Sequence, residues 1–183
     1  INNIKEDNPS FVWHGIHILN DQKNLPAIKI FNIKGKTIRV AFASAYTGRE
    51  SCPYATCIED IEAILTNLKM AKVDFRILSL HSQGGQELLV NTAKRFITDF
   101  NGDIVFGHGP HVWKPVRVIP KKNGSRGVIF ESLGNFLHPS MAVQEKNIIG
   151  RALFDLDSLK LVQVQALPVK NDKLKIHFSS TDP

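Results

Sequence analysis

The sequence predicts an α/β protein with mixed β-sheets, and three observations support this fold class. Between residues 37 and 108, apolar strand patterns alternate with amphipathic helix patterns, as in units that join parallel strands through a helix. After residue 111 the chain shows only strand and turn patterns. A chain of 183 residues is long enough for one well-filled domain and too short for two. We therefore expect one domain, 1–183, that begins with alternating elements and ends in β-structure.

The first regular elements form a hairpin. Residues 1–26 show no long period and are expected to be irregular, with His14 and His17 as turn or surface residues. Ala27–Ile33 and Thr37–Ala45 have strand patterns on either side of a glycine-bearing turn, which predicts a β-hairpin. The middle of the second strand is continuously apolar, as a central strand buried on both faces should be.

Two helices are predicted by apolar residues that recur at helical spacing. The first begins at a capping box formed by Thr56 and Glu59 and continues to about Lys72. The second covers Gln86–Phe100 and ends at Asn101-Gly102, which supplies a left-handed cap. The apolar stripes of both helices are expected to face the core.

Strands precede and follow the second helix. Phe75–His81 comes before it and Asp103 leads into an apolar strand after it, so the connection should be a right-handed crossover between parallel strands. The C-terminal part contains a hairpin around Asn123-Gly124 and three later strands. Its predicted strands are Val112–Pro120, Gly127–Ser132, Ile148–Asp155, Leu159–Val169 and Leu174–Phe178.

Histidines follow the ends of the two apolar strands of the crossover. His81 closes the strand ILSLH, and His108 and His111 lie in the run DIVFGHGPH. Because the carboxyl ends of parallel strands meet at one edge of a sheet, the three imidazoles should lie close together there. Imidazole is the commonest side-chain metal ligand, so we predict that they bind a metal. The alternative is that they are structural anchors of the loops.

Carboxylates suited to bridging two metals are missing from this pattern. Asp103 enters its strand at the opposite end, and the turn Leu133-Gly134-Asn135-Phe136 has no histidine after its asparagine. Three neutral imidazoles can hold one zinc-like ion with an open position. We therefore expect the chain to bind at most one metal ion, and to bind it weakly.

Composition narrows the classes of partner. The net charge of +6 favours anionic partners mildly, but the basic residues are scattered, so nucleic-acid binding is not expected. Cys52 and Cys57 have a spacing that fits neither a redox pair nor a zinc site. They form either a small-loop disulfide or two inert thiols. No run is apolar enough to span a bilayer, and we find no targeting segment in this chain.

Three runs of the sequence resemble the CapA family of poly-γ-glutamate capsule synthesis proteins. They are VDFRILSLH at 73–81, GDIVFGHGPHV at 102–112 and FESLGNF at 130–136. The fold of this family is similar to that of calcineurin-like metallophosphatases. The resemblance therefore implies mixed β-sheets that form a distorted sandwich flanked by helices. The N-terminal Gly-Asp and Asn-His motifs of the family have no counterpart here, so the chain looks like the C-terminal portion of a CapA-like domain.

The resemblance also implies roles for individual residues. His81, His108 and His111 match histidines of the family and would be both metal ligands and catalytic residues. Asn135 and Glu87 would contact substrate, although the match to Glu87 needs a two-residue shift, because Ser82-Gln83-Gly84-Gly85 replaces the family's usual sequence. The implied cofactor is a divalent metal, Mn, Zn or Fe, held weakly or not at all by this chain.

The implied function is that of a metal-dependent, phosphoesterase-like protein in poly-γ-glutamate or capsule biosynthesis. Metal-bound hydroxide would attack a phosphoryl or acyl centre of an anionic polymer or phosphate-containing substrate, if the full protein supplies the missing ligands. The alternative is a non-catalytic module that binds an anionic polymer or partners in a membrane-bound synthesis complex. By the same resemblance we expect an extracytoplasmic or membrane-associated location.

Overall fold

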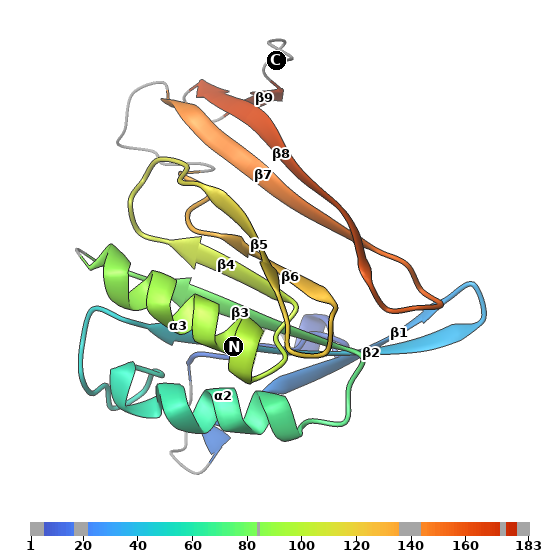
Figure 1. Cartoon of the computed structure of the whole chain (residues 1–183). Coiled ribbons are helices and arrows are strands. Elements are labelled where there is room, and N and C mark those ends of the chain that lie inside the picture. The colour runs from blue at the N-terminus through green and yellow to red at the C-terminus, as the bar shows by residue number, and fades with distance from the viewer. Residues whose placement is uncertain (1–5, 17–21, 84, 136–143, 173–174, 179–183) are drawn as a thin grey trace.

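A six-stranded sheet lies at the centre of the molecule. The computed structural model describes residues 6–16, 22–83, 85–135, 144–172 and 175–178 (Figure 1). The strand order in this sheet is β1-β2-β3-β4-β6-β5. The four inner strands run parallel, and β1 and β5 pair antiparallel at the two edges. The strands are β1 (Ala27–Ile33), β2 (Lys36–Tyr46), β3 (Phe75–His81), β4 (Ile104–His108), β5 (Val116–Pro120) and β6 (Arg126–Phe130).

The hairpin and the central strand are confirmed. β1 and β2 pair antiparallel from Ala27 opposite Phe42 to Ile33 opposite Lys36. Along β2, Ala41, Ala43 and Ala45 are buried on the face covered by helices. Their small side chains let a helix approach the strand closely, because only a methyl group separates the backbones.

Two helices cover one face of this sheet (Figure 1). They are α2 (Ile61–Met70), which follows the short 3-10 turn η2 (Ile58–Asp60), and α3 (Gln86–Asp99). Neither helix in the described ranges is long and apolar enough to cross a bilayer. Their inward residues form the main core with the strands beneath them. Its largest fully buried members include Ile64, Leu65, Leu68, Leu78, Leu80, Leu89, Phe96, Ile97, Val105 and Ile129.

The start of the first helix differs from the prediction. Asp60, not Glu59, accepts the capping hydrogen bond, which comes from the Cys57 N–H at 3.0 Å. Glu59 is exposed and pairs with Lys23. The hydroxyl of Thr56 donates to the carbonyl of Ser44 in β2. Thr56 therefore does not cap the helix, because its hydroxyl is hydrogen-bonded to a strand that is distant in the sequence.

The ends of both helices have clear causes. The Arg76 guanidinium donates to the carbonyls of Leu68 and Ala71, each at 2.8 Å, and so satisfies the last turn of α2. At the end of α3, Asn101 has φ 59° and the Gly102 N–H bonds the Phe96 carbonyl at 2.9 Å. This is the predicted left-handed cap. It turns the chain into β4, which pairs parallel to β3 as the crossover pattern predicted.

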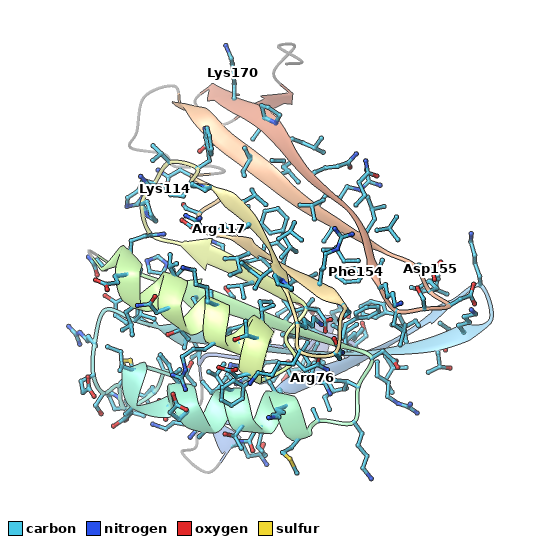
Figure 2. All side chains as sticks on the ribbon, in the orientation of Figure 1. Arg76, Lys114, Arg117, Phe154, Asp155 and Lys170 are labelled. Atoms are coloured by element: carbon cyan, nitrogen blue, oxygen red, sulfur yellow. A yellow bond between two sulfur atoms is a disulfide. The ribbon has the colours of Figure 1, made fainter. Side chains whose placement is uncertain are left out.

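A second, antiparallel sheet lies on the other face of the central sheet (Figure 1). It consists of β7 (Gln144–Phe154), β8 (Leu161–Asp172) and β9 (Lys175–Phe178). Val128, Phe130 and Leu161 form a second buried cluster between the sheets. Where β7 ends (Figure 2), the Phe154 ring packs against Phe75 with centroids 4.8 Å apart. The expected distorted sandwich flanked by helices is confirmed.

A buried ion pair fixes the amino end of β4. The carboxylate of Asp103 pairs with Lys121 from the β5–β6 turn, and both side chains are almost fully buried. Asp103 also accepts the Arg76 N–H of β3 at 2.8 Å. Burial raises the pKa of Asp103, and the charge of Lys121 opposes that rise. As predicted, Asp103 lies at the end of β4 opposite to the histidines.

Removing the charge of Lys121 should destabilise the fold strongly. We expect Lys121→Met to lower the free energy of unfolding by about 3–5 kcal/mol at neutral pH, because Asp103 would remain buried without its partner. The neighbouring Lys122 pairs with Asp99 in an exposed position, where water screens the two charges, so Lys122→Met should leave stability nearly unchanged. Urea denaturation of both variants measures the difference.

The stability lost in the Lys121→Met variant should depend on pH. Because folding raises the pKa of Asp103, the folded state takes up a proton more readily than the unfolded state, and this group opposes folding as the pH rises from about 4. The loss caused by Lys121→Met should therefore shrink at acidic pH, where Asp103 becomes neutral. An equal loss at neutral and acidic pH would contradict the buried pair.

Candidate functional site

The carboxyl ends of three parallel strands align in one row. In the register of the sheet, Tyr46 at the end of β2 lies opposite His81 at the end of β3. His81 in turn lies opposite His108 at the end of β4. Register partners in a parallel sheet project from the same face, so the His81 and His108 side chains are neighbours. The structure therefore brings together two of the three predicted histidines.

The two neighbouring imidazoles differ in their surroundings. His81 is exposed, whereas His108 is half-buried. Burial lowers the pKa of His108, and the nearby charge of His81 lowers it further. Neither ring has a hydrogen bond within the part of the chain that the structure describes. Both therefore keep ring nitrogens that can bind a ligand.

His111 has a different partner from the one expected. Its Nδ1 lies 2.7 Å from the Oδ1 of Asn135, on the turn after β6. Because an amide oxygen only accepts, the Nδ1 of a neutral ring carries the hydrogen of this bond. The structure thus joins two other predicted residues, His111 and Asn135, through one hydrogen bond.

Glycine determines the path of the loop after β4. Gly109 has φ +128°, and a Cβ on it would lie 1.7 Å from the carbonyl oxygen of Ser82. Beside it, the Ser82 N–H donates to the His108 carbonyl at 2.9 Å. The loop after β4 therefore rests directly on the loop after β3, which only glycine permits.

The carboxylates lie apart from these imidazoles. Glu87 is exposed in the first turn of α3, and no hydrogen bond or ion pair joins it to the described histidines. Sequence reasoning missed Glu131, which is buried directly after β6 and pairs with Arg117 (Figure 2). By strand alternation Glu131 shares the helix-covered face with Ile129, whereas His108 projects from the other face.

The histidines are of a type that binds metal ions, but too few of the described ones lie together to form a complete metal site. Imidazole nitrogens are good ligands for Zn, Mn or Fe. Within the described ranges, however, no three His, Cys, Asp or Glu side chains are arranged to hold a metal ion. His81, His108 and His111 therefore do not complete a metal centre by themselves, and their role as ligands stays a prediction. His17, His138 and the His177 side chain lie outside what the structure describes.

Two residues that the sequence did not single out border the site. Tyr46 packs against His81 with ring centroids 5.8 Å apart. His14 is half-buried, and it lines a cavity of about 260 Å³ together with His81. Of the two positions expected for His14, turn or surface, the half-buried side chain rules out the surface. Its position depends on contacts with β2, about thirty residues later in the chain, which no local pattern indicates.

A family model matches most of the chain. The family model described as "Bacterial capsule synthesis protein PGA_cap" matches residues 8–140. The PGA biosynthesis protein CapA of Bacillus subtilis (strain 168) is 33% identical to the chain, over 63% of this chain and 33% of that protein. The chain thus spans about one third of the length of this relative.

Two solved structures share the fold. A novel phosphatase from Mycoplasma pneumoniae superposes with a TM-score of 0.55 and 14% identity, over 86% of this chain and 62% of that chain. A hypothetical protein from Thermus thermophilus superposes with a TM-score of 0.52 and 13% identity, over 80% of this chain and 65% of that chain. At these identities the likeness concerns the fold alone.

Coupling between the two histidines should be visible in their titration. We expect the pKa of His108 to lie below its usual value of about 6.5 and to rise in a His81→Asn variant, because one of its two causes is removed. In this variant the pKa of His108 should still lie below its usual value, because the ring remains half-buried. Histidine Cε1–H chemical shifts followed against pH measure both values. A His108 titration unaffected by the variant would contradict the coupling.

The loop geometry predicts unequal effects of two glycine substitutions. Gly109 and Gly124 both have positive φ, but nothing lies within 4 Å of a Cβ on Gly124. We expect Gly124→Ala to cost about 1 kcal/mol of stability from backbone strain alone. Gly109→Ala should cost about 3 kcal/mol or more, because the Ser82 backbone must also move. Thermal unfolding compares the two, and equal losses would contradict the contact between the loops.

Proposed function

The chain belongs to the bacterial capsule synthesis protein PGA_cap family and has a phosphatase-like fold. We propose that the carboxyl edge of its sheet forms part of a metal-dependent hydrolytic site that acts in the synthesis of an anionic capsule polymer. The polymer would be of the poly-γ-glutamate kind, as the name of the B. subtilis relative indicates. The alignment of His81 with His108 at the strand ends carries this proposal.

The chain's own residues would supply part of a metal site. His81 and His108 offer adjacent imidazoles from rigid strands, and His111, oriented by Asn135, offers a third. Burial lowers the pKa of His108, which keeps the ring neutral and able to act as a ligand near neutral pH. A divalent Mn, Zn or Fe ion held there would polarise a phosphoryl or acyl group of the substrate.

The rest of the ligand set would come from elsewhere in a longer protein. A two-metal hydrolytic site needs carboxylates. Asp103 and Glu131 are paired with Lys121 and Arg117, and no hydrogen bond or ion pair joins Glu87 to the described histidines. The chain spans about one third of the length of its B. subtilis relative. By itself we therefore propose that it binds at most one metal ion weakly and hydrolyses little or nothing.

A second candidate function is binding without catalysis. In it, the chain would hold an anionic polymer, or partners within a membrane-bound synthesis complex. The net charge of +6 and the incomplete ligand set support this alternative. Glu87 and Asn135 would contact the polymer in either case, and nucleic acid is not proposed as a partner.

The disulfide between Cys52 and Cys57 is relevant to the cellular compartment of the protein. Cys52 and Cys57, whose state the sequence left open, are joined by a disulfide. Disulfides persist in oxidising compartments and are rare in the cytosol. This supports the proposal that the protein works outside the cytoplasm or at the outer side of a membrane.

Metal titration tests the hydrolytic proposal. We expect calorimetry with zinc and manganese to show weak binding of at most one ion, and a His81→Asn/His108→Asn variant to lose it. Glu87→Gln is the control, since no hydrogen bond or ion pair joins it to the histidines, and it should bind as the unchanged chain does. A generic phosphodiester assay on the same samples should show little or no turnover.

Two results would count against this account. Tight binding of two ions with turnover would mean that the chain already contains the whole ligand set. No metal binding, even after the chain is extended as in the longer relative, would favour the polymer-binding module.

A further inference from the structure

We propose that the His81–His108 pair lies between two substrate subsites, so that the site accepts an internal stretch of a linear polymer rather than a small phosphate ester. This inference rests on the proposed function, because it assumes that the pair faces substrate. It adds how the substrate lies: across the strand ends, with at least one unit on each side of the pair.

The first subsite is the cavity on the β2 side of the pair, which we call the β2 cavity. It measures about 260 Å³. Its lining includes Tyr46 of β2, Ser79 and His81 of β3, and His14 and Thr56 from segments beside β2. The remaining lining residues are Gly15, Ile16, Ser44, Ala45 and Ala55. The cavity therefore combines apolar surface with hydroxyl and imidazole groups, and none of its described lining residues is acidic.

Long-range hydrogen bonds hold the wall of the β2 cavity in place. The Ser44 N–H donates to the Nδ1 of His14, and the Ser44 hydroxyl donates to the His14 carbonyl, both at 2.9 Å. Gly15 has φ +100°, and a Cβ there would lie 2.2 Å from the Ser44 Oγ. The close approach of this segment to β2 thus depends on glycine, and the wall is a fixed part of the fold.

The loop after β2 contributes Ala55 and Thr56 to the lining of the same cavity. The Tyr46 N–H donates to the Thr56 carbonyl at 2.9 Å, and the Thr56 N–H donates to the Gly15 carbonyl at 3.2 Å. The disulfide between Cys52 and Cys57 ties this loop to itself directly beside Thr56. Three separate chain segments therefore meet around one preformed space, as expected for a binding site.

The second subsite is a cavity on the other side of the pair, which we call the β7 cavity. It measures about 300 Å³ and is lined by His108, Leu133 and Gly134, and by Ile148, Ile149 and Gly150 of β7. His108 is the only titratable residue among these lining residues. The β7 cavity is therefore mostly apolar and suits the methylene groups of a substrate.

Strand order sets the two cavities in line. The order β2-β3-β4-β6 puts the β2 cavity on one flank of His81 and the β7 cavity on the far flank of His108. Ser79 and His81 alternate with Leu78 and Leu80 of the helix-covered core, so they project from the opposite face. Phe106 and His108 project from that face too, toward the second sheet. Both cavities therefore open beside the pair on one face.

The chemistry of the two cavities indicates the kind of unit that they hold. The cavities are similar in size, about 260 and 300 Å³, so the two sides of the pair are matched. A glutamyl unit joins methylene groups to a carboxylate, which matches apolar walls next to hydroxyls and imidazoles. We therefore assign one glutamyl unit of an anionic polymer to each cavity.

Binding of γ-linked glutamate oligomers of increasing length tests this arrangement. The titrations are made by calorimetry with EDTA present, so that metal occupancy plays no part. We expect affinity to rise about tenfold or more with length and to level off once the oligomer spans both cavities. On the unchanged chain, amide shifts should move near Ser79 and Ala55 and also near Gly134 and Gly150.

Variants that fill each cavity test the two subsites separately. Ser79→Leu reduces the β2 cavity and Ile148→Phe, on the side of β7 that faces the central sheet, reduces the β7 cavity. Each should weaken binding of the long oligomer about tenfold. Together their effects should multiply. Val162→Phe adds comparable bulk at an exposed position on β8 and should leave binding unchanged.

Several results would overturn the inference. These are an affinity independent of oligomer length, an effect of only one of the two filling variants, or amide shifts confined to one side of the pair. Because shift mapping uses the unchanged chain, the test holds even if a variant fails to fold. A failure to bind metal would overturn the hydrolytic proposal and leave this test untouched.

Discussion

The in-register parallel pairing of β2, β3 and β4 is the constraint on which the rest of the structure depends. It places Tyr46, His81 and His108 in one row at the carboxyl edge of the sheet. A slip of one residue would turn a histidine toward the helices and away from the open face. The helices cover one face of the central sheet and the second sheet covers the other. The carboxyl edge of the central sheet remains accessible.

The two ends of β4 have opposite characters. At the amino end, Asp103 and Lys121 are buried together and joined to β3 through the Arg76 N–H. At the carboxyl end, the loop carrying His108 rests on Ser82 through a glycine contact. A rigid, closed amino end thus holds the register, while the carboxyl end presents side chains with unused nitrogens. Such a division is typical of open α/β sheets.

Much of the fold and part of the candidate site could be predicted from the sequence, because these features depend on local residue patterns. The crossover, the hairpins, the cap at Asn101 and the alignment of His81 with His108 follow from strand and helix periods. The rest depends on contacts between distant residues. The hydroxyl of Thr56 bonds β2 instead of capping its helix, and His14 is placed by Ser44. His111 and Asn135 meet only once the turn after β6 folds back.

His81 and His108 are proposed to present their imidazoles to one ligand at the sheet edge. Anomalous diffraction from crystals of the chain grown with zinc is the most direct test of this arrangement. We expect one zinc peak within bonding distance of both the His81 and His108 rings, at partial occupancy. Zinc bound only elsewhere, or the two rings on opposite faces of the sheet, would contradict it.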